Sequence, residues 1–156
     1  MNDVSSPIKY SVAIGSDHAG FVLKEAVREG LAAKGVKVTD FGTHSEESVD
    51  YPDFAKAVAT SVAMGEHDLG VLICGTGIGM SMAANRVKGI RAAACSEPYS
   101  ARMARAHNNA NVLCMGGRVV GPGLALDIVT AFLETEFEFG SRHERRVAMI
   151  SAMESC

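Results

Sequence analysis

The stretch LGVLICGTGIGM, residues 69–80, carries the clearest structural signal in this 156-residue chain. Its first six residues form a continuous apolar run, which is typical of a strand buried on both faces of a parallel sheet. Glycines then stand at alternate positions, Gly75, Gly77 and Gly79. A glycine-rich turn between a strand and a helix usually presents backbone N–H groups to an anion. The stretch therefore predicts an α/β fold with a ligand site after this strand, and Cys74 stands at the entrance of that site.

Short apolar runs alternate with amphipathic segments along the rest of the chain. This alternation indicates βαβ units with right-handed crossovers. We therefore expect residues 1–156 to form one domain, a three-layer α/β/α sandwich of Rossmann-like type with a mostly parallel sheet of about five strands. The expected strands are residues 8–15, 36–40, 69–74, 90–95 and 111–115, and the expected helices are residues 19–34, 54–63, 78–87, 98–106, 124–134 and 142–153.

Composition excludes several classes of protein. The net charge of −3 favours no broad attraction to nucleic acid. No apolar run approaches the roughly 20 residues that span a bilayer, and the first ten residues do not resemble a signal peptide. We therefore expect a cytoplasmic protein that binds neither nucleic acid nor membrane.

Four cysteines are present and none belongs to a CxxC pair, so neither a zinc site nor a thioredoxin-type redox motif is indicated. Cys95 and Cys114 are expected to be small buried apolar residues, and Cys156 a tail residue. Cys74 has to be judged together with the glycine loop that follows it.

In open parallel sheets, ligands bind at the carboxyl ends of the strands. Polar and titratable residues flank the expected strands at several points, and we predict that they gather on this one rim. They are Asp17, His18, Cys74, Thr76, Glu97, His107, Asn108 and Arg118.

The glycine loop matches neither common phosphate-binding motif. Met80 stands where the dinucleotide fingerprint GxGxxG wants a glycine, and the GK[ST] ending of a P-loop is absent. Glu97 could be the acid that binds a ribose hydroxyl, but Ser96-Glu97-Pro98 also resembles a helix start, and we prefer that interpretation. The loop instead offers N–H groups to an anion or to an oxyanion formed during a reaction. Alternatively, its glycines merely permit a tight turn.

Cys74 would lie near the positive end of the following helix, which favours a thiolate. A thiolate there could act as a nucleophile or as a general base, and it could also be inert. Nucleophilic thiols commonly work with a histidine, and His107 is a possible partner in space. The residues alone leave these roles open.

Several motifs together resemble ribose-5-phosphate isomerase type B, in a wider group that includes galactose-6-phosphate and allose-6-phosphate isomerases. The resemblance runs in order from about residue 8 to residue 150. The motifs are GSDHAGFVLK (15–24), DYPDFA (50–55), LICGTGIGMSMAAN (72–85), GIRAAACSEPYSARMARAHNNANVLCMGGRVVG (89–121) and RHERR (142–146).

The resemblance implies an isomerase that interconverts an aldose phosphate and a ketose phosphate through an enediol(ate), without metal or organic cofactor. Cys74 matches the family's base, and the N–H groups from Gly75 through Gly79 would meet the negative charge that develops on oxygen. Thr76 and His107 match the positions assigned to opening of the sugar ring. Asp17, Tyr51 and Asn108 match residues that contact sugar hydroxyls or catalytic groups. On their own, Asp17 would be interpreted as a helix cap, Asn108 as a turn residue, and His107 as a cation at a helix C-terminus.

The resemblance also implies phosphate binding by His18, Arg118, Arg142 and Arg146. Some of these arginines reach a neighbouring subunit in the family, so we expect a homodimer with shared active sites, possibly a dimer of dimers, in which the helix at 142–153 contacts the partner. On its own, RHERR would indicate a solvated helix surface. The family usually has a segment like FEGGRH before this helix, whereas FEFGSRH (137–143) stands here with one residue more, which puts the reach of Arg142 in doubt.

The leading hypothesis is conversion of ribose 5-phosphate to ribulose 5-phosphate. The same chemistry on a hexose or tetrose phosphate is an alternative. A non-catalytic nucleotide- or phosphate-binding module is the contrasting class, and a cysteine hydrolase is weaker, because no acid that could orient His107 is evident from the sequence.

Overall fold

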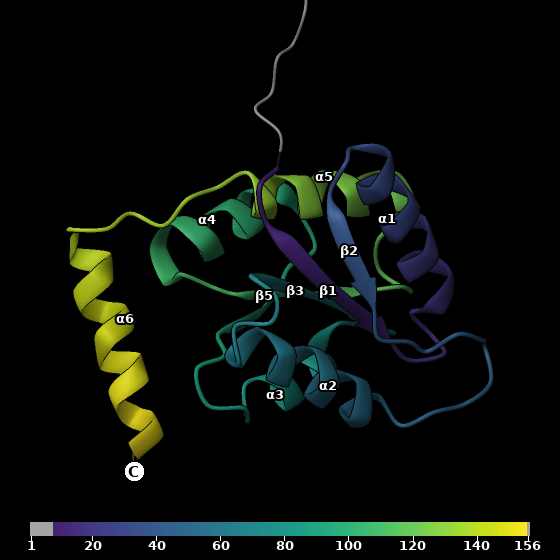
Figure 1. Ribbon diagram of the computed structural model, residues 1–156, viewed down its shortest axis with the longest axis horizontal. Coiled ribbons are helices and arrows are strands. Elements are labelled where there is room, and N and C mark those ends of the chain that lie inside the picture. Colours follow the sequence, from purple (N-terminus) through teal and green to yellow (C-terminus); the bar gives the residue numbers. More distant parts are fainter. Residues whose placement is uncertain (1–7, 156) are drawn as a thin grey trace, which may run out of the picture.

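The structure, a computed structural model, describes residues 8–155, so the expectations for residues 1–7 and for Cys156 lie outside it. Its five strands form one parallel sheet in the order β2-β1-β3-β5-β4 (Figure 1). Strand order reverses between β1 and β3, and ligands of open parallel sheets bind at the carboxyl ends of the strands at such a point. The strands are β1 (Ser11–Ser16), β2 (Lys37–Asp40), β3 (Leu69–Cys74), β4 (Ala92–Ala94) and β5 (Val112–Gly116).

Helices cover both faces of the sheet, which confirms the predicted three-layer sandwich. Helices α1, α4 and α5 lie on one face and α2 and α3 on the other (Figure 1). The helices are α1 (Phe21–Ala33), α2 (Tyr51–Ala63), α3 (Ile78–Ala84), α4 (Pro98–Asn108), α5 (Pro122–Leu133) and α6 (Arg142–Ala152), and a short 3₁₀ turn follows at Met153–Ser155.

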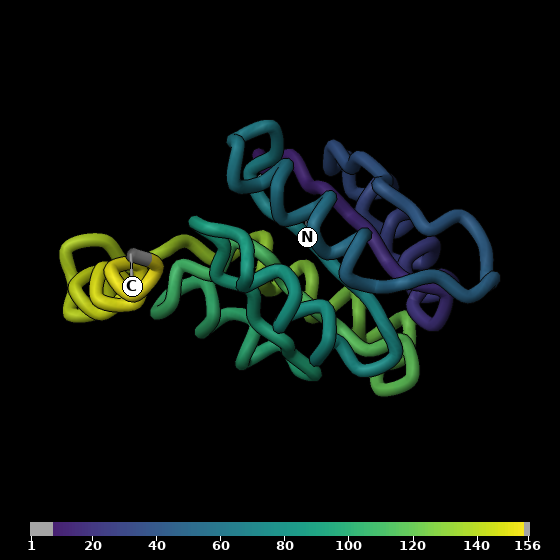
Figure 2. Tube along the Cα trace, turned by 90° about the horizontal axis from the view of Figure 1, so that it is seen from below, coloured from purple at the N-terminus to yellow at the C-terminus, as the bar shows by residue number. Residues whose placement is uncertain are grey.

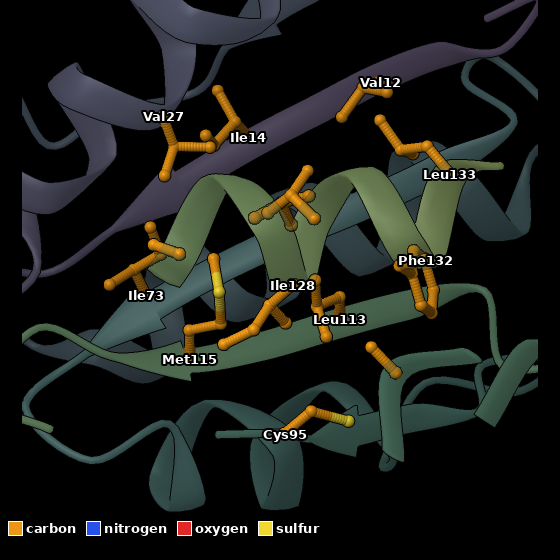
Figure 3. Close-up of a cluster of buried hydrophobic side chains, with 14 of the residues drawn as sticks. Val12, Ile14, Val27, Ile73, Cys95, Leu113, Met115, Ile128, Phe132 and Leu133 are labelled. Atoms are coloured by element: carbon orange, nitrogen blue, oxygen red, sulfur yellow. The ribbon is translucent and has the colours of Figure 1, made fainter. Parts of the chain in front are cut away.

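The core under α5 shows why this face is rigid. Ile128 and Phe132 of α5 pack against strand residues such as Ile73 and Leu113, and all four are fully buried (Figure 3). Each such side chain contributes about 1.5–3 kcal/mol to folding through burial. This core holds β1, β3 and β5 in register and therefore fixes the positions of the residues that leave their ends.

Several element boundaries differ from the prediction, and two of these differences have clear local reasons. Helix α2 begins at Tyr51 rather than at 54, because Pro52 sits in the first turn, where its missing N–H costs nothing. Strand β4 is three residues long rather than six. It lies at the border of the sheet, where the Asn85 side chain bonds both the N–H (2.8 Å) and the C=O (3.0 Å) of Ala92.

Helix α6 lies to one side of the sandwich, at the end of an extended segment that leaves α5 (Figures 1 and 2). Val147 is its one buried residue, whereas Met149, Ile150 and Met153 just beyond its end are 60%, 46% and 68% exposed. An arm with so much exposed apolar surface is suited to pack against another surface. Among the described residues, no helix is both long and apolar enough to cross a bilayer.

Candidate active site

The carboxyl ends of β1, β3 and β5 collect most of the predicted site residues. Asp17 and His18 leave β1, Cys74 ends β3, and Arg118 follows β5. The strand ends are level, because Ser16 pairs with Ile73 and Cys74 pairs with Gly116. We call Asp17, His18, Tyr51, Cys74, Thr76 and Arg118 the β3 group.

Cys74 is 5% exposed, and its sulfur is held by the loop that follows it. The N–H of Gly77 donates to Sγ at 3.1 Å. This contact requires glycine at 77, because φ there is +81° and a Cβ would lie 2.9 Å from the carbonyl carbon of Met115. An N–H donor at this distance stabilises negative charge on the sulfur.

One further N–H group of the loop, that of Ile78, already has a hydrogen-bond acceptor inside the loop. The N–H of Ile78 donates to Thr76 Oγ1 at 3.3 Å, so an incoming oxyanion competes with contacts inside the loop. Gly79 has a steric reason of its own, since a Cβ there would lie 2.8 Å from the Tyr51 ring. The glycines thus shape the turn and seat Tyr51 beside it, and Gly77 directs its N–H at the thiol.

The structure agrees with the exclusion of a dinucleotide loop. Met80 is a fully buried residue of α3. In a dinucleotide loop a third glycine stands at this place and lets the helix approach the sheet closely. Glu97 is the N-cap of α4, and its carboxylate accepts the Ser100 N–H at 2.8 Å, a bond that lowers the pKa of Glu97. The helix-start interpretation of Glu97 is therefore confirmed.

His18 and Arg118 flank the Cys74 loop with hydrogen-bond donors. His18 Nδ1 accepts the Val49 N–H at 3.2 Å, which leaves the ring proton on Nε2, free to donate to an anion. The Arg118 N–H donates to Gly75 O at 3.1 Å, and its guanidinium lies against Gly75. Arg118 thus offers a positive charge and His18 an N–H donor, a combination suited to a phosphate.

Asp17 is buried, and its carboxylate accepts the Gly20 N–H at 3.0 Å, at the start of α1. The N-cap of α1 is Gly20 and no side chain caps this helix, so the capping role expected from Asp17 alone is not present, and Asp17 instead binds the turn that leads into α1. Its own N–H donates to Ile73 O at 3.1 Å, so the carboxyl is fixed next to β3.

A buried ion pair that the sequence pattern did not reveal supports the loop at 41–50. The Lys24 ammonium is fully buried and bonds both carboxylate oxygens of Asp40, at 2.6 and 2.7 Å. Asp40 also accepts the Gly42 N–H at 2.8 Å, and Gly42 O accepts the Ser16 N–H at 2.7 Å. The one signal in the sequence was a lysine on the apolar stripe of the first helix, between Leu23 and Val27.

The prediction that His107 and Asn108 share the rim with Cys74 is wrong within one chain. Both residues end α4, which runs back from the carboxyl ends of the strands to their amino ends. The length of β5, four steps of about 3.3 Å or about 13 Å, lies between that level and Cys74. Residues that precede a parallel strand lie at the end opposite to those that follow one.

His107 instead stacks on His143 of α6, with ring centroids 4.0 Å apart and planes inclined by 6°. Glu138 lies beside both rings, with its carboxylate oxygens 3.7 Å from His107 Nε2 and 3.8 Å from His143 Nε2. Burial, reinforced by His107, lowers the pKa of His143. An acid therefore does stand near His107, contrary to expectation, because the Glu138 N–H bonds Ala106 O (3.1 Å) and joins two segments distant in sequence.

Arg142 and Arg146 are exposed on α6, four residues apart on one face. The extra residue in FEFGSRH is absorbed before the helix: Gly140 has φ +73°, and Ser141 becomes the N-cap, accepting the His143 N–H at 3.1 Å. Arg142 thus keeps the first helical position. We call Arg142 and Arg146 of α6, together with His107 and Asn108 at the adjoining end of α4, the α6 group.

The remaining described cysteines match their predicted role. Cys114 is fully buried and Cys95 nearly so, and Figure 3 shows Cys95 at the border of the core. Burial raises the pKa of Cys95 to about 11, and it also holds the pKa of Cys114 well above its usual value. Both therefore stay neutral thiols, unlike reactive cysteines.

A doubly wound parallel sheet with a buried thiol and cationic side chains at its switch point defines a Rossmann-like protein with a site for an anionic ligand. The chain belongs to the ribose/galactose isomerase family, whose model matches residues 12–150.

Individual relatives cover nearly the whole chain. Ribose-5-phosphate isomerase B of Escherichia coli is 54% identical over 143 residues, which are 92% of this chain and 95% of the relative. D-erythrulose-4-phosphate isomerase of Pectobacterium atrosepticum is 48% identical, over 83% of this chain and 86% of the relative. A structure of Mycoplasma genitalium ribose-5-phosphate isomerase B with bound ribulose 5-phosphate superposes with a TM-score of 0.88 at 45% identity, covering 93% and 96% of the two chains.

Proposed function

We propose that this protein is a ribose-5-phosphate isomerase of type B, an aldose–ketose isomerase that uses Cys74 as its base. The observation that carries the proposal is the buried Cys74 sulfur at the end of the central strand β3, held by the Gly77 N–H at 3.1 Å. A binding module has no use for a thiol so placed. Membership of the ribose/galactose isomerase family and the 54% identity to the E. coli enzyme support ribose 5-phosphate as substrate.

In this mechanism the Cys74 thiolate takes the proton from carbon 2 of the open-chain aldose. The electron pair of that C–H bond forms the carbon 1–carbon 2 double bond, and negative charge moves onto the carbonyl oxygen. Backbone N–H groups of residues 75–79 stabilise this charge. The hydroxyl proton of oxygen 2 passes to oxygen 1, the Cys74 thiol returns its proton to carbon 1, and carbon 2 becomes the carbonyl carbon of the ketose.

The proposal includes a homodimer with shared active sites. Within one chain the β3 group and the α6 group lie at opposite ends of the strands, so His107 cannot serve the Cys74 of its own chain. A two-fold axis brings each α6 group to the β3 group of the other copy and makes the interface isologous. The exposed apolar residues on α6 support the proposal that this helix packs against the partner subunit. His107 and Thr76 then open the sugar ring, while Asp17, Tyr51 and Asn108 contact its hydroxyls.

Phosphate binding in this arrangement is divided between the two copies. His18 and Arg118 come with the β3 group, and Arg142 and Arg146 come with the α6 group. The free thiols of Cys74, Cys95 and Cys114 favour a reducing compartment, so we place the enzyme in the cytoplasm.

Substitution Cys74→Ala tests the base assignment. We expect kcat for ribose 5-phosphate to fall by about 10²–10⁴-fold, the usual contribution of a general base. The circular dichroism spectrum, melting temperature and elution volume should match those of the wild type. Near-normal turnover in this variant would sink the cysteine-base assignment.

A panel of erythrose 4-phosphate, ribose 5-phosphate, allose 6-phosphate and galactose 6-phosphate tests the substrate. The tetrose is included because the P. atrosepticum relative, at 48% identity, is an erythrulose-4-phosphate isomerase. We expect the highest kcat/KM for ribose 5-phosphate, with deuterium entering from heavy water at the carbon that is reprotonated. A higher value for the tetrose or a hexose would reassign the substrate, and absence of exchange with every sugar would contradict the enediol route.

A further inference from the structure

We propose that His107, Glu138 and His143 form an inhibitory site for a divalent transition metal, with Zn²⁺ the best match. The inhibition rests on the proposed function, because it acts by withdrawing His107 from ring opening. The binding itself rests only on the three side chains. One ligand atom from each lies within 4.8 Å of the others.

The distances fit a cation better than they fit a direct hydrogen bond. The two carboxylate oxygens of Glu138 lie 3.7 and 3.8 Å from the two imidazole Nε2 atoms. A charge-assisted hydrogen bond would be about 2.7–2.9 Å long. Around tetrahedral Zn²⁺, with bonds of about 2.0–2.1 Å, neighbouring ligand atoms stand about 3.4 Å apart. A shift of a few tenths of an ångström therefore brings Glu138 into ligand geometry with either ring.

The imidazole rings must turn for both to bind. In the stack the ring planes differ by 6° and the centroids lie 4.0 Å apart, so lone pairs in the two nearly parallel planes do not converge on one point. Binding opens this stack until the lone pairs converge on the metal. His107 has room for the rotation because its side chain is 36% exposed, whereas that of His143, at 12%, is the fixed ligand.

The backbone holds the three ligands together without a metal. His107 ends α4, His143 is in the first turn of α6, and Glu138 lies in the connecting segment. That segment is fixed at both sides, because the Glu138 N–H donates to Ala106 O at 3.1 Å and its C=O accepts the Ser141 hydroxyl at 2.6 Å. Preorganisation of this kind reduces the entropy lost on binding.

Two imidazoles and one carboxylate suit Zn²⁺ by ligand type, and they leave a fourth position for water. Arg142 and Arg146 are the opposing charges, and their repulsion weakens the site. We therefore expect reversible binding that a chelator removes, rather than a permanent structural metal.

Direct binding is measured with Co²⁺ as a spectroscopic probe on the Cys74→Ala dimer, in which the thiol cannot ligate. We expect the visible absorption of four-coordinate Co²⁺, with one ion per subunit, displaced by Zn²⁺. Glu138→Gln and His143→Gln should each weaken binding by at least about tenfold. His44→Gln, an exposed histidine elsewhere on the chain, is the matched control and should bind as its parent does.

Inhibition is measured on the dimer with Cys74 intact, as the ratio of isomerase rates with and without Zn²⁺ in each variant. We expect the wild type and His44→Gln to lose activity reversibly and Glu138→Gln to need at least about tenfold more Zn²⁺. Absence of Co²⁺ binding would overturn the site and leave the isomerase proposal intact. Stoichiometric binding at unchanged rate would overturn the inhibition and, separately, the role of His107.

Discussion

At the scale of single residues, Gly77 connects backbone geometry to the Cys74 sulfur. Substitution Gly77→Ala places a Cβ 2.9 Å from the carbonyl carbon of Met115 at a φ of +81°. We expect a loss of about 1–3 kcal/mol in the free energy of unfolding, because an L-residue is strained there. We also expect lower kcat, because relief of the strain moves the N–H away from Cys74 Sγ. Urea titration and steady-state kinetics measure the two effects.

Gly75→Ala is the matched control for the stability effect. It lies two residues away, its φ is not positive, and an added Cβ would meet its nearest atom, Arg118 Nη1, at 3.5 Å, an ordinary contact. Equal stability of the two variants would contradict the strain argument at Gly77.

Local residues of the site could be predicted from sequence, and distant contacts could not. Cys74 and its glycines are neighbours in the chain, so their spacing already indicates a loop around a thiol. The contact of Glu138 with His107 joins positions 31 residues apart, and no periodicity links them. Buried Lys24 was hidden for a similar reason, because its partner Asp40 comes from the next strand.

At the scale of elements, the Lys24–Asp40 pair fixes the start of the segment at 41–50, which carries Val49 to His18 and leads to Tyr51. A double-mutant cycle with Lys24→Met and Asp40→Asn should give a coupling free energy of about 1–3 kcal/mol, because the ammonium has no water to replace its partner. The KM for the sugar phosphate should rise, since His18 loses its oriented ring. Unfolding titrations and steady-state kinetics on the four proteins supply both numbers.

The matched comparison is the Arg28–Glu25 pair on the same helix, whose side chains are 37% and 30% exposed. The same cycle with Arg28→Met and Glu25→Gln should give less than about 1 kcal/mol, as for other solvated pairs. A coupling for Lys24–Asp40 no larger than this would show that burial adds nothing to the pair.

The order and type of the helices and strands could be predicted from the sequence, because most segments are long enough for the spacing of their apolar residues to distinguish a helix from a strand. Their ends could not, since side chains decide them. Asn85 supports β4 from outside the sheet, and Pro52 allows α2 to begin at Tyr51. These details matter for the site. The predicted helix begins at residue 54 and leaves Tyr51 in a loop, whereas in the structure Tyr51 is the first residue of α2.

At the scale of the whole molecule, direction along the sheet decides which residues can meet. The sequence predicts that residues around each strand share a rim, yet the His107 end of α4 lies at the amino ends of the strands and Cys74 at the carboxyl ends. In a parallel sheet this polarity follows from position in the chain, because residues that precede a strand lie at its amino end. A shared site between two copies reconciles the family resemblance with the distance observed in one chain.

Mixing two inactive variants tests that sharing. Cys74→Ala and His107→Ala dimers are each expected to be strongly impaired, because each lacks one half of both sites. In a mixed dimer, one site combines both substitutions and the other combines an intact Cys74 with an intact His107. Random exchange of subunits makes half of the dimers mixed, so about a quarter of wild-type activity should appear. Unfolding and refolding the mixture, with each variant refolded alone as the control, measures the recovery. If each site were built within one chain, the mixture would stay as inactive as its parents.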